Sequence, residues 1–209
     1  MTETVTLVPA EYTDLAQVRT FNQDEDMLED LVMFLIPAVS RAIDRLCRRV
    51  FFTTQAMRIY DWQDNHTVRL RDDLVALTTI LTNTGQTFTA NDFVLTPYEG
   101  PPYARLVARE GLGSSLVYQA TRTAALQVNG LWGYQMTLPP EVGLACTAWV
   151  SDIYAQSDTR GLESMSGGGV RAAMRKLEEG PPPDVKGWLT PFFKPTRLAV
   201  LSSTGRVFG

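Results

Sequence analysis

Histidine and cysteine are nearly absent from the sequence, which limits the chemistry that it can support. Among 209 residues there are one histidine, His66, and two cysteines, Cys47 and Cys146. One histidine provides no metal-binding pair, and the two cysteines lack the close spacing of zinc ligands. We expect His66 to lie in a surface turn and both thiols to be buried without a disulfide. The sequence therefore predicts no metal site.

Catalytic and nucleotide-binding motifs are also missing. The run Gly167–Gly169 lacks the Lys-Ser/Thr pair of a phosphate-binding loop. Ser114 and Ser115 do not have the spacing of a nucleophile elbow. The carboxylates at Asp72 and Asp73, and those between Asp24 and Asp30, are interpreted as solvated turn and cap residues. We therefore predict no enzyme, no catalytic residue and no cofactor.

No long apolar run and no strongly basic balance is present. The longest apolar run, Leu31 to Val39, is about half a membrane span and contains Pro37. The opening residues have neither the basic start nor the apolar centre of a signal peptide. The net charge of −4 and the pI near 5.1 argue against a general nucleic-acid binder, although not against contact with DNA. We expect no membrane association.

Two segments have helical periodicity. Residues 24–50 carry an apolar residue at steps of three and four, with an acidic start and a basic end that suit the helix dipole. Pro37 predicts a kink or a break near Ile36, and Asn22 with Glu25 predicts a capping box. Residues 140–155 predict a second helix, rich in small residues, that packs against the first. A short helix is expected at residues 14–20.

Between the two long helices, residues 56–130 change to a β pattern. Short β-branched and aromatic runs alternate with turn residues, which predicts a small antiparallel sheet or barrel. Asn83–Gln86 predicts a hairpin turn in which Gly85 takes a positive φ. The expected strands lie around Met57–Trp62, Thr67–Leu70, Leu74–Thr82, Arg105–Ala108, Leu116–Tyr118 and Ala124–Val128.

Residues 157–209 differ from the rest in composition. A Gly-Ser stretch predicts a flexible linker, a short helix is expected at 170–179, and Pro181–Pro183 predicts an extended spacer. The predicted fold class is α+β, with a core of packed α-helices, an inserted small antiparallel β module and an extended, flexible C-terminal arm. Residues 1–156 form the core in this prediction, and residues 157–209 form the linker, short helix and docking arm.

The order of these segments resembles the head–tail connector (adaptor) family of tailed bacteriophages. The similarity begins at DEDMLEDLV and IDRLCRRVFF in the long helix, although Arg48 stands where a glycine is common. It continues through LRDDLVALTTILTNTGQTF, NDFVLTPYEGPPYARLVA and VNGLWGYQMTLPPEVGLACTAWVSDIY, and it ends with LTPFFKPTRL. Together these phrases cover roughly residues 13–200.

The resemblance implies a structural subunit of a phage neck, in the virion at the head–tail interface, after assembly in the host cytoplasm. Such subunits form a ring of about twelve copies beneath the portal protein. The ring extends the channel for packaged double-stranded DNA and contacts the next neck or tail component, a stopper or a tail terminator. The implied portal-docking residues are Trp188, Leu189, Phe192, Phe193, Lys194 and Arg197, since aromatic and arginine side chains dominate interface energetics.

Alternatives remain open at this point. Trp188 and Phe192 can instead fold back on their own core. The chain can be another neck or tail-completion protein. It can also be a DNA-binding module that uses the arginines of the segment Arg45–Arg49, although the end of the helix already explains those residues.

Overall fold

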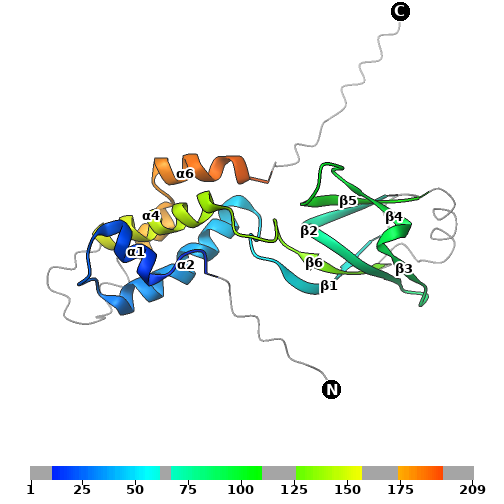
Figure 1. The fold of residues 1–209 in the computed structure, drawn as a ribbon, viewed down its shortest axis with the longest axis horizontal. Helices are drawn as coiled ribbons and strands as arrows, with labels where there is room; N and C mark the ends of the chain where they lie inside the picture. The colour runs from blue at the N-terminus through cyan, green and yellow to red at the C-terminus, as the bar shows by residue number, and fades with distance from the viewer. Residues whose placement is uncertain (1–10, 62–66, 110–125, 157–173, 195–209) are drawn as a thin grey trace, which may run out of the picture.

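A helical body and a β module lie end to end in the computed structural model (Figure 1). The structure describes residues 11–61, 67–109, 126–156 and 174–194. The chain enters the helical body, leaves it for the β module, and returns to the body for its last described residues. The fold is therefore α+β, with an antiparallel sheet inserted between helices, as the sequence predicted.

The helical body is built from α1 (Leu15–Asn22), α2 (Glu29–Cys47), α4 (Pro140–Gln156) and α6 (Pro183–Leu189). Residues 174–179 are also helical, and the short 3-10 helix η2 (Thr190–Phe192) follows α6. The predicted contact between the two long helices is confirmed, because α2 and α4 share one buried apolar cluster. Its fully buried members include Val32, Leu35, Val39, Ile43, Val142, Ala145, Val150 and Ile153.

Helix α2 differs from the prediction at two places. The prediction was a kink or a break near Ile36; the helix continues through Pro37, so it is not broken there. The Ser40 hydroxyl donates to the carbonyl of Ile36 at 2.8 Å, and the surrounding side chains hold both halves of the helix in the core. The helix also begins at Glu29, after a capping residue, Leu28, that makes no side-chain cap. Asn22 does not form the predicted capping box, because it belongs to α1 and its amide donates to Ser151.

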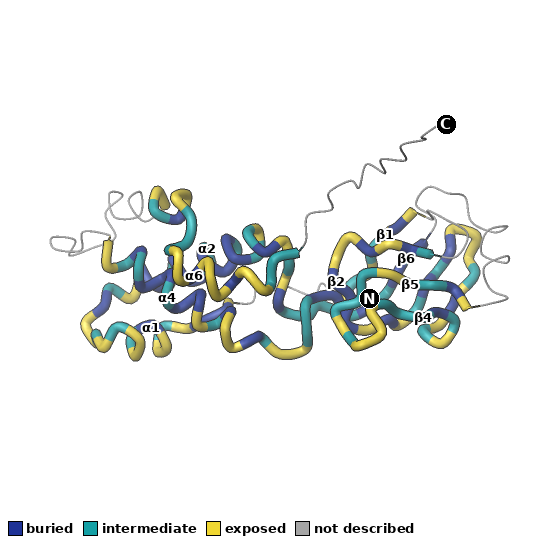
Figure 2. Tube along the Cα trace, turned by 90° about the horizontal axis from the view of Figure 1, so that it is seen from above, coloured by how far each residue is buried: buried dark blue, intermediate teal, exposed yellow. Residues whose placement is uncertain are grey.

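The described residues of the β module form six strands around a core of their own. They are β1 (Thr54–Tyr60), β2 (Thr67–Thr82), β3 (Thr87–Thr89), β4 (Phe93–Thr96), β5 (Tyr103–Ala108) and β6 (Leu126–Trp132). The order is β1-β6-β2-β5-β4, with β3 paired to the end of β2, and every pairing is antiparallel. Figure 2 shows buried residues inside the helical body and again inside the module.

The strands predicted at residues 67–82 and the predicted hairpin turn have different outcomes in the structure. The strands expected at Thr67–Leu70 and Leu74–Thr82 are one strand, β2, whose pairing with β5 shifts between Arg69 and Leu74. The hairpin turn is confirmed, because Gly85 has a φ of 86° and the Thr82 amide donates to Gln86 at 2.8 Å. The strand expected at Leu116–Tyr118 lies outside the described residues.

The C-terminal segment Pro183–Lys194 packs on the helical body. Helix α6 lies along α4, and its Val185 and Leu189 side chains are 2% and 0% exposed. For these residues the expectation of an extended, free arm is wrong, because their apolar side chains complete the core of α2 and α4. The rest of the predicted linker and arm, residues 157–173 and 195–209, lies outside the described residues.

Candidate interaction surfaces

The six predicted docking residues have different environments. Trp188 is the most accessible of those described, at 39% exposed, whereas Leu189 is fully buried among the body helices. The Phe192 ring meets Phe51 and Tyr134 edge-on, with centroids 5.8 and 5.7 Å apart. Phe193 also packs on the body core, and Arg197 lies outside the described residues. The buried position of Leu189 corrects its predicted role, because a partner cannot reach its side chain.

Lys194 ends the described chain at the junction between the helical body and the β module. Its ammonium group donates to Asp73 Oδ1 at 2.9 Å and to the carbonyl of Arg71 at 2.8 Å, both on β2. Its backbone amide donates to the carbonyl of Cys47, the last residue of α2, at 2.9 Å. One residue therefore connects the C-terminal segment with both parts of the molecule.

Arg49 joins the same three segments from the end of α2. Its guanidinium donates to Asp73 Oδ2 at 2.7 Å and to the carbonyl of Phe192 at 2.8 Å. It also lies over the Tyr134 ring, 5.0 Å from the centroid, where a cation is attracted to the aromatic face. We call Asp73, Arg49 and Lys194 the junction cluster.

The carboxylate of Asp73 is the centre of this cluster and was misjudged from sequence. It is only 7% exposed, whereas Asp72 is accessible and pairs with Arg58 on β1. Successive side chains of a strand point to opposite faces, so the pair Asp72–Asp73 in a half-buried strand should place one carboxylate inward. That alternation was the available signal for a buried acid.

A pocket of about 260 Å³ opens beside the junction cluster. Five positively charged and three negatively charged side chains line it. The positive ones are Arg45, Arg48, Arg49, Arg58 and Lys194, and the negative ones are Asp44, Asp72 and Asp73. We call this the basic pocket. Its positive excess contrasts with the net charge of −4 of the whole chain.

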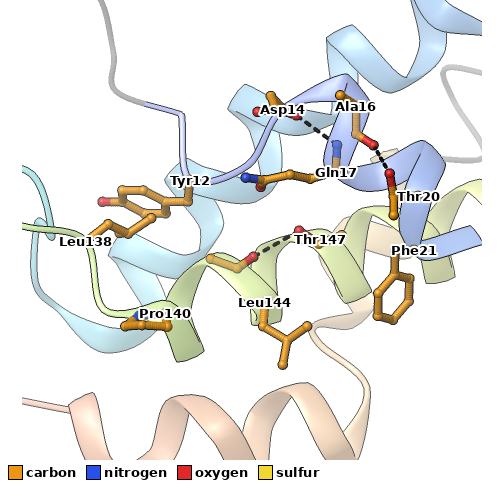
Figure 3. Close-up of a pocket in the computed structure, with 11 residues that line it drawn as sticks. Tyr12, Asp14, Ala16, Gln17, Thr20, Phe21, Leu138, Pro140, Leu144 and Thr147 are labelled. Carbon is orange, nitrogen blue, oxygen red and sulfur yellow. Dashed lines mark hydrogen bonds between the residues drawn. The ribbon is translucent and has the colours of Figure 1, made fainter.

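An open groove of about 610 Å³ runs between α1 and α4 (Figure 3). The segment before α1 crosses α4 closely, since a Cβ added at Gly143 would lie 3.3 Å from the carbonyl oxygen of Tyr12. The Thr13 and Thr147 hydroxyls, 2.6 Å apart, join this same segment to α4. Figure 3 shows Phe21 and Leu144 projecting from its wall, and both remain nearly half exposed. This is an apolar surface without a covering element among the described residues.

The two cysteine thiols line neither the groove nor the pocket. Burial raises the pKa of the Cys47 and Cys146 thiols to about 12, so both stay protonated at neutral pH and are poor nucleophiles. Both are buried and unpaired, as predicted. Within the described ranges no cluster of His, Cys, Asp and Glu side chains could hold a metal ion. His66 lies outside those ranges.

No helix in the described part of the chain is long and apolar enough to cross a membrane. No protein-family model and no curated protein matches the sequence.

Leu189 and Trp188 differ in burial and should therefore differ in how much their side chains stabilise the fold. Leu189→Ala should lower the free energy of unfolding by about 3 kcal/mol, because it leaves a cavity under α6. Trp188→Ala should change it by less than about 1 kcal/mol, because much of that ring is already in water. Urea denaturation of both variants provides the comparison. Equal and small effects would contradict the packing of α6 on α4.

Proposed function

We propose that the chain is a structural subunit of a phage neck. It forms an oligomeric ring beneath the portal protein, extends the channel for packaged DNA, and joins the filled head to a stopper or tail terminator. Its location is the virion, at the head–tail interface. The proposal assigns the protein no catalytic reaction.

One observation supports this function above the others. The two segments that flank the β insertion, α2 and α4, form a single core, so the module is presented at one end of a helical body. This is the arrangement that the resemblance to connector proteins implies. A fold alone does not determine a function, so the exposed surfaces of the chain must also suit a ring subunit.

Exposed apolar side chains lie on both parts of the molecule and are available for contacts between subunits. Phe21 and Leu144 lie on the helical body, whereas Met57 and Ile59 are about half exposed on the edge strand β1. A closed ring requires heterologous contacts, in which one patch of a subunit meets a different patch of the next. Two distinct apolar surfaces on different parts of one chain are consistent with that requirement.

The packing of Pro183–Lys194 changes which residues are available to the portal. Leu189 belongs to the body, and Phe192, Phe193 and Lys194 hold the C-terminal segment at the junction. Docking is therefore assigned to residues 195–209, including Arg197, with Trp188 as an accessible neighbour.

A truncation after Lys194 tests this assignment. The shortened protein should keep its free energy of unfolding within about 0.5 kcal/mol, because its core is intact, and should no longer form a ring on the purified portal by electron microscopy. The full chain on the same portal is the positive control. Normal ring formation by the truncated protein would refute docking through residues 195–209, and failure of the full chain to bind any portal from its own phage would refute the function.

A DNA-binding module is the second candidate, because Arg45 and Arg48 are exposed at the basic pocket. Three carboxylates line the same pocket, and the chain is acidic overall, which both oppose binding to phosphates. A salt-dependent shift of duplex DNA by the isolated protein would favour this candidate.

A further inference from the structure

The two ends of helix α2 carry opposite charge. At its start, the acidic patch consists of Asp24, Glu25, Asp26, Glu29 and Asp30. All but Asp24 are exposed, and Glu29 forms an ion pair with Arg19 of α1. At its other end lies the basic pocket, where Arg45 and Arg48 are exposed. The 19 residues of α2 separate the two ends by about 28 Å.

We infer that the basic pocket of one subunit receives the acidic patch of a second copy. This inference rests on the proposed function and identifies the contact between ring neighbours. The contact is head to tail, because the two patches differ and lie at different places on the chain. Repetition of such a contact builds a ring or a filament, depending on the rotation between neighbours.

The charges of the pocket favour an acidic protein surface over DNA. Arg49 and Lys194 are already engaged by Asp73, and Arg58 is engaged by Asp72. The most exposed cations of the pocket, Arg45 and Arg48, lie close together at the end of α2, beside Asp44. A compact group of carboxylates matches this arrangement, whereas a duplex presents a long row of phosphates and requires a row of cations.

An exposed apolar side chain accompanies each of the two charged surfaces. Phe21 lies three residues before Asp24 and is 48% exposed, while Val50 lines the basic pocket and is 44% exposed. Exposed ion pairs contribute little individually, and they act mainly by steering and orienting partners. Phe21 of one copy and Val50 of the next would bury apolar surface in the contact. The charges then select which surfaces meet.

The positions of the patches set the direction of the helix in a ring. Each contact advances the next subunit by about the length of α2, along the helix axis. A planar ring therefore closes only if α2 runs around the circumference instead of along the channel. This orientation can be recognised in an electron microscopy reconstruction.

Charge reversal on the full chain tests the contact. Arg45→Glu with Arg48→Glu should weaken self-association by at least about tenfold in sedimentation velocity at low salt, and so should Glu25→Lys with Asp26→Lys. A mixture of the two variants should associate again, because each reversed patch then meets a complementary one. Wild-type association should fall between about 0.01 M and about 1 M salt, as the Debye length falls from about 30 Å to about 3 Å.

The matched control is Arg69→Glu with Arg105→Glu. These exposed arginines are paired across β2 and β5, away from both patches, and their reversal changes the net charge by the same amount. Their reversal should leave association unchanged.

Three results would overturn the contact: wild-type protein that stays monomeric at low salt, reversed variants that associate normally, or a mixture that does not recover. Binding to the portal is measured separately on the same variants. Portal binding that persists without a charge-dependent neighbour contact would leave the proposed function intact and reject only this inference.

Discussion

Asp73→Ala should lower the free energy of unfolding by about 3 kcal/mol, the largest effect expected of any single charged residue described. The substitution leaves Arg49 and Lys194 at the junction without their carboxylate, and the side chain of Arg49 is only 14% exposed. Removing one partner of a buried ion pair costs about 3–5 kcal/mol, and the partial exposure of Lys194 places this case at the lower end. Urea denaturation followed by circular dichroism measures the change.

Two controls separate the charge from other effects. Asp73→Asn keeps the shape and one acceptor oxygen, so it should cost about half as much. Asp72→Ala removes the neighbouring carboxylate, whose pair with Arg58 is accessible to water, and should cost less than about 1 kcal/mol. Equal effects at residues 72 and 73 would show that the junction cluster does not hold the segments together.

The junction cluster also explains why the position of the C-terminal segment could not be predicted. Lys194 and Asp73 are separated by 121 residues, and Arg49 and Phe192 by 143 residues. No local pattern links residues at such distances. The composition of Trp188–Lys194 indicated an apolar segment that needs a partner, and both a portal and its own core satisfy that need. The core of the chain supplies the partner for Leu189.

Local patterns succeeded where the physical cause was local. The apolar side of α2 follows from the spacing of Leu31, Leu35, Val39 and Ile43, and all four are buried. The turn at Gly85 follows from the freedom of glycine at positive φ. The prediction for the start of α2 was wrong because a tertiary contact, from Asn22 to Ser151, competes with the capping box.

The candidate interaction surfaces also combine features with a local cause in the sequence and features that depend on the tertiary fold. The basic end of α2 was visible in sequence as Arg45, Arg48 and Arg49, of which Arg45 lies in the last turn of the helix. The contributions of Arg58 and Lys194 to the same pocket were not visible, since they come from β1 and from the end of the C-terminal segment. The groove beside Phe21 and Leu144 likewise depends on how α1 crosses α4.

The residue types in the segment VNGLWGY are explained by tertiary contacts, which the sequence alone could not reveal. Gly130 lies in β6 where an added Cβ would be 2.5 Å from the carbonyl oxygen of Ala76 on β2. Trp132 is 1% exposed and stacks on Tyr60 within the module. Tyr134 then returns to the helical body, where its amide donates to Val50 at 2.8 Å. The phrase therefore forms the connection between the module and the body.

Gly133→Ala should be the most disruptive substitution within this phrase. Gly133 has a φ of 149°, and an added Cβ would lie 2.4 Å from the carbonyl oxygen of Phe52. Its own amide donates to the carbonyl of Asp73 at 2.9 Å, so the backbone cannot rotate away without losing that bond. Backbone strain and the clash together should lower the free energy of unfolding by at least about 3 kcal/mol.

Gly187→Ala is the matched control for this change. Gly187 lies within α6, and an added Cβ there would meet no atom within 4 Å. Alanine is the better helix former, so this variant should gain about 0.5–1 kcal/mol. Urea denaturation of the two variants should therefore shift in opposite directions. A stable Gly133→Ala protein would mean that the chain does not pass Phe52 as closely as described, and the fixed placement of the β module against the helical body would then lose its basis.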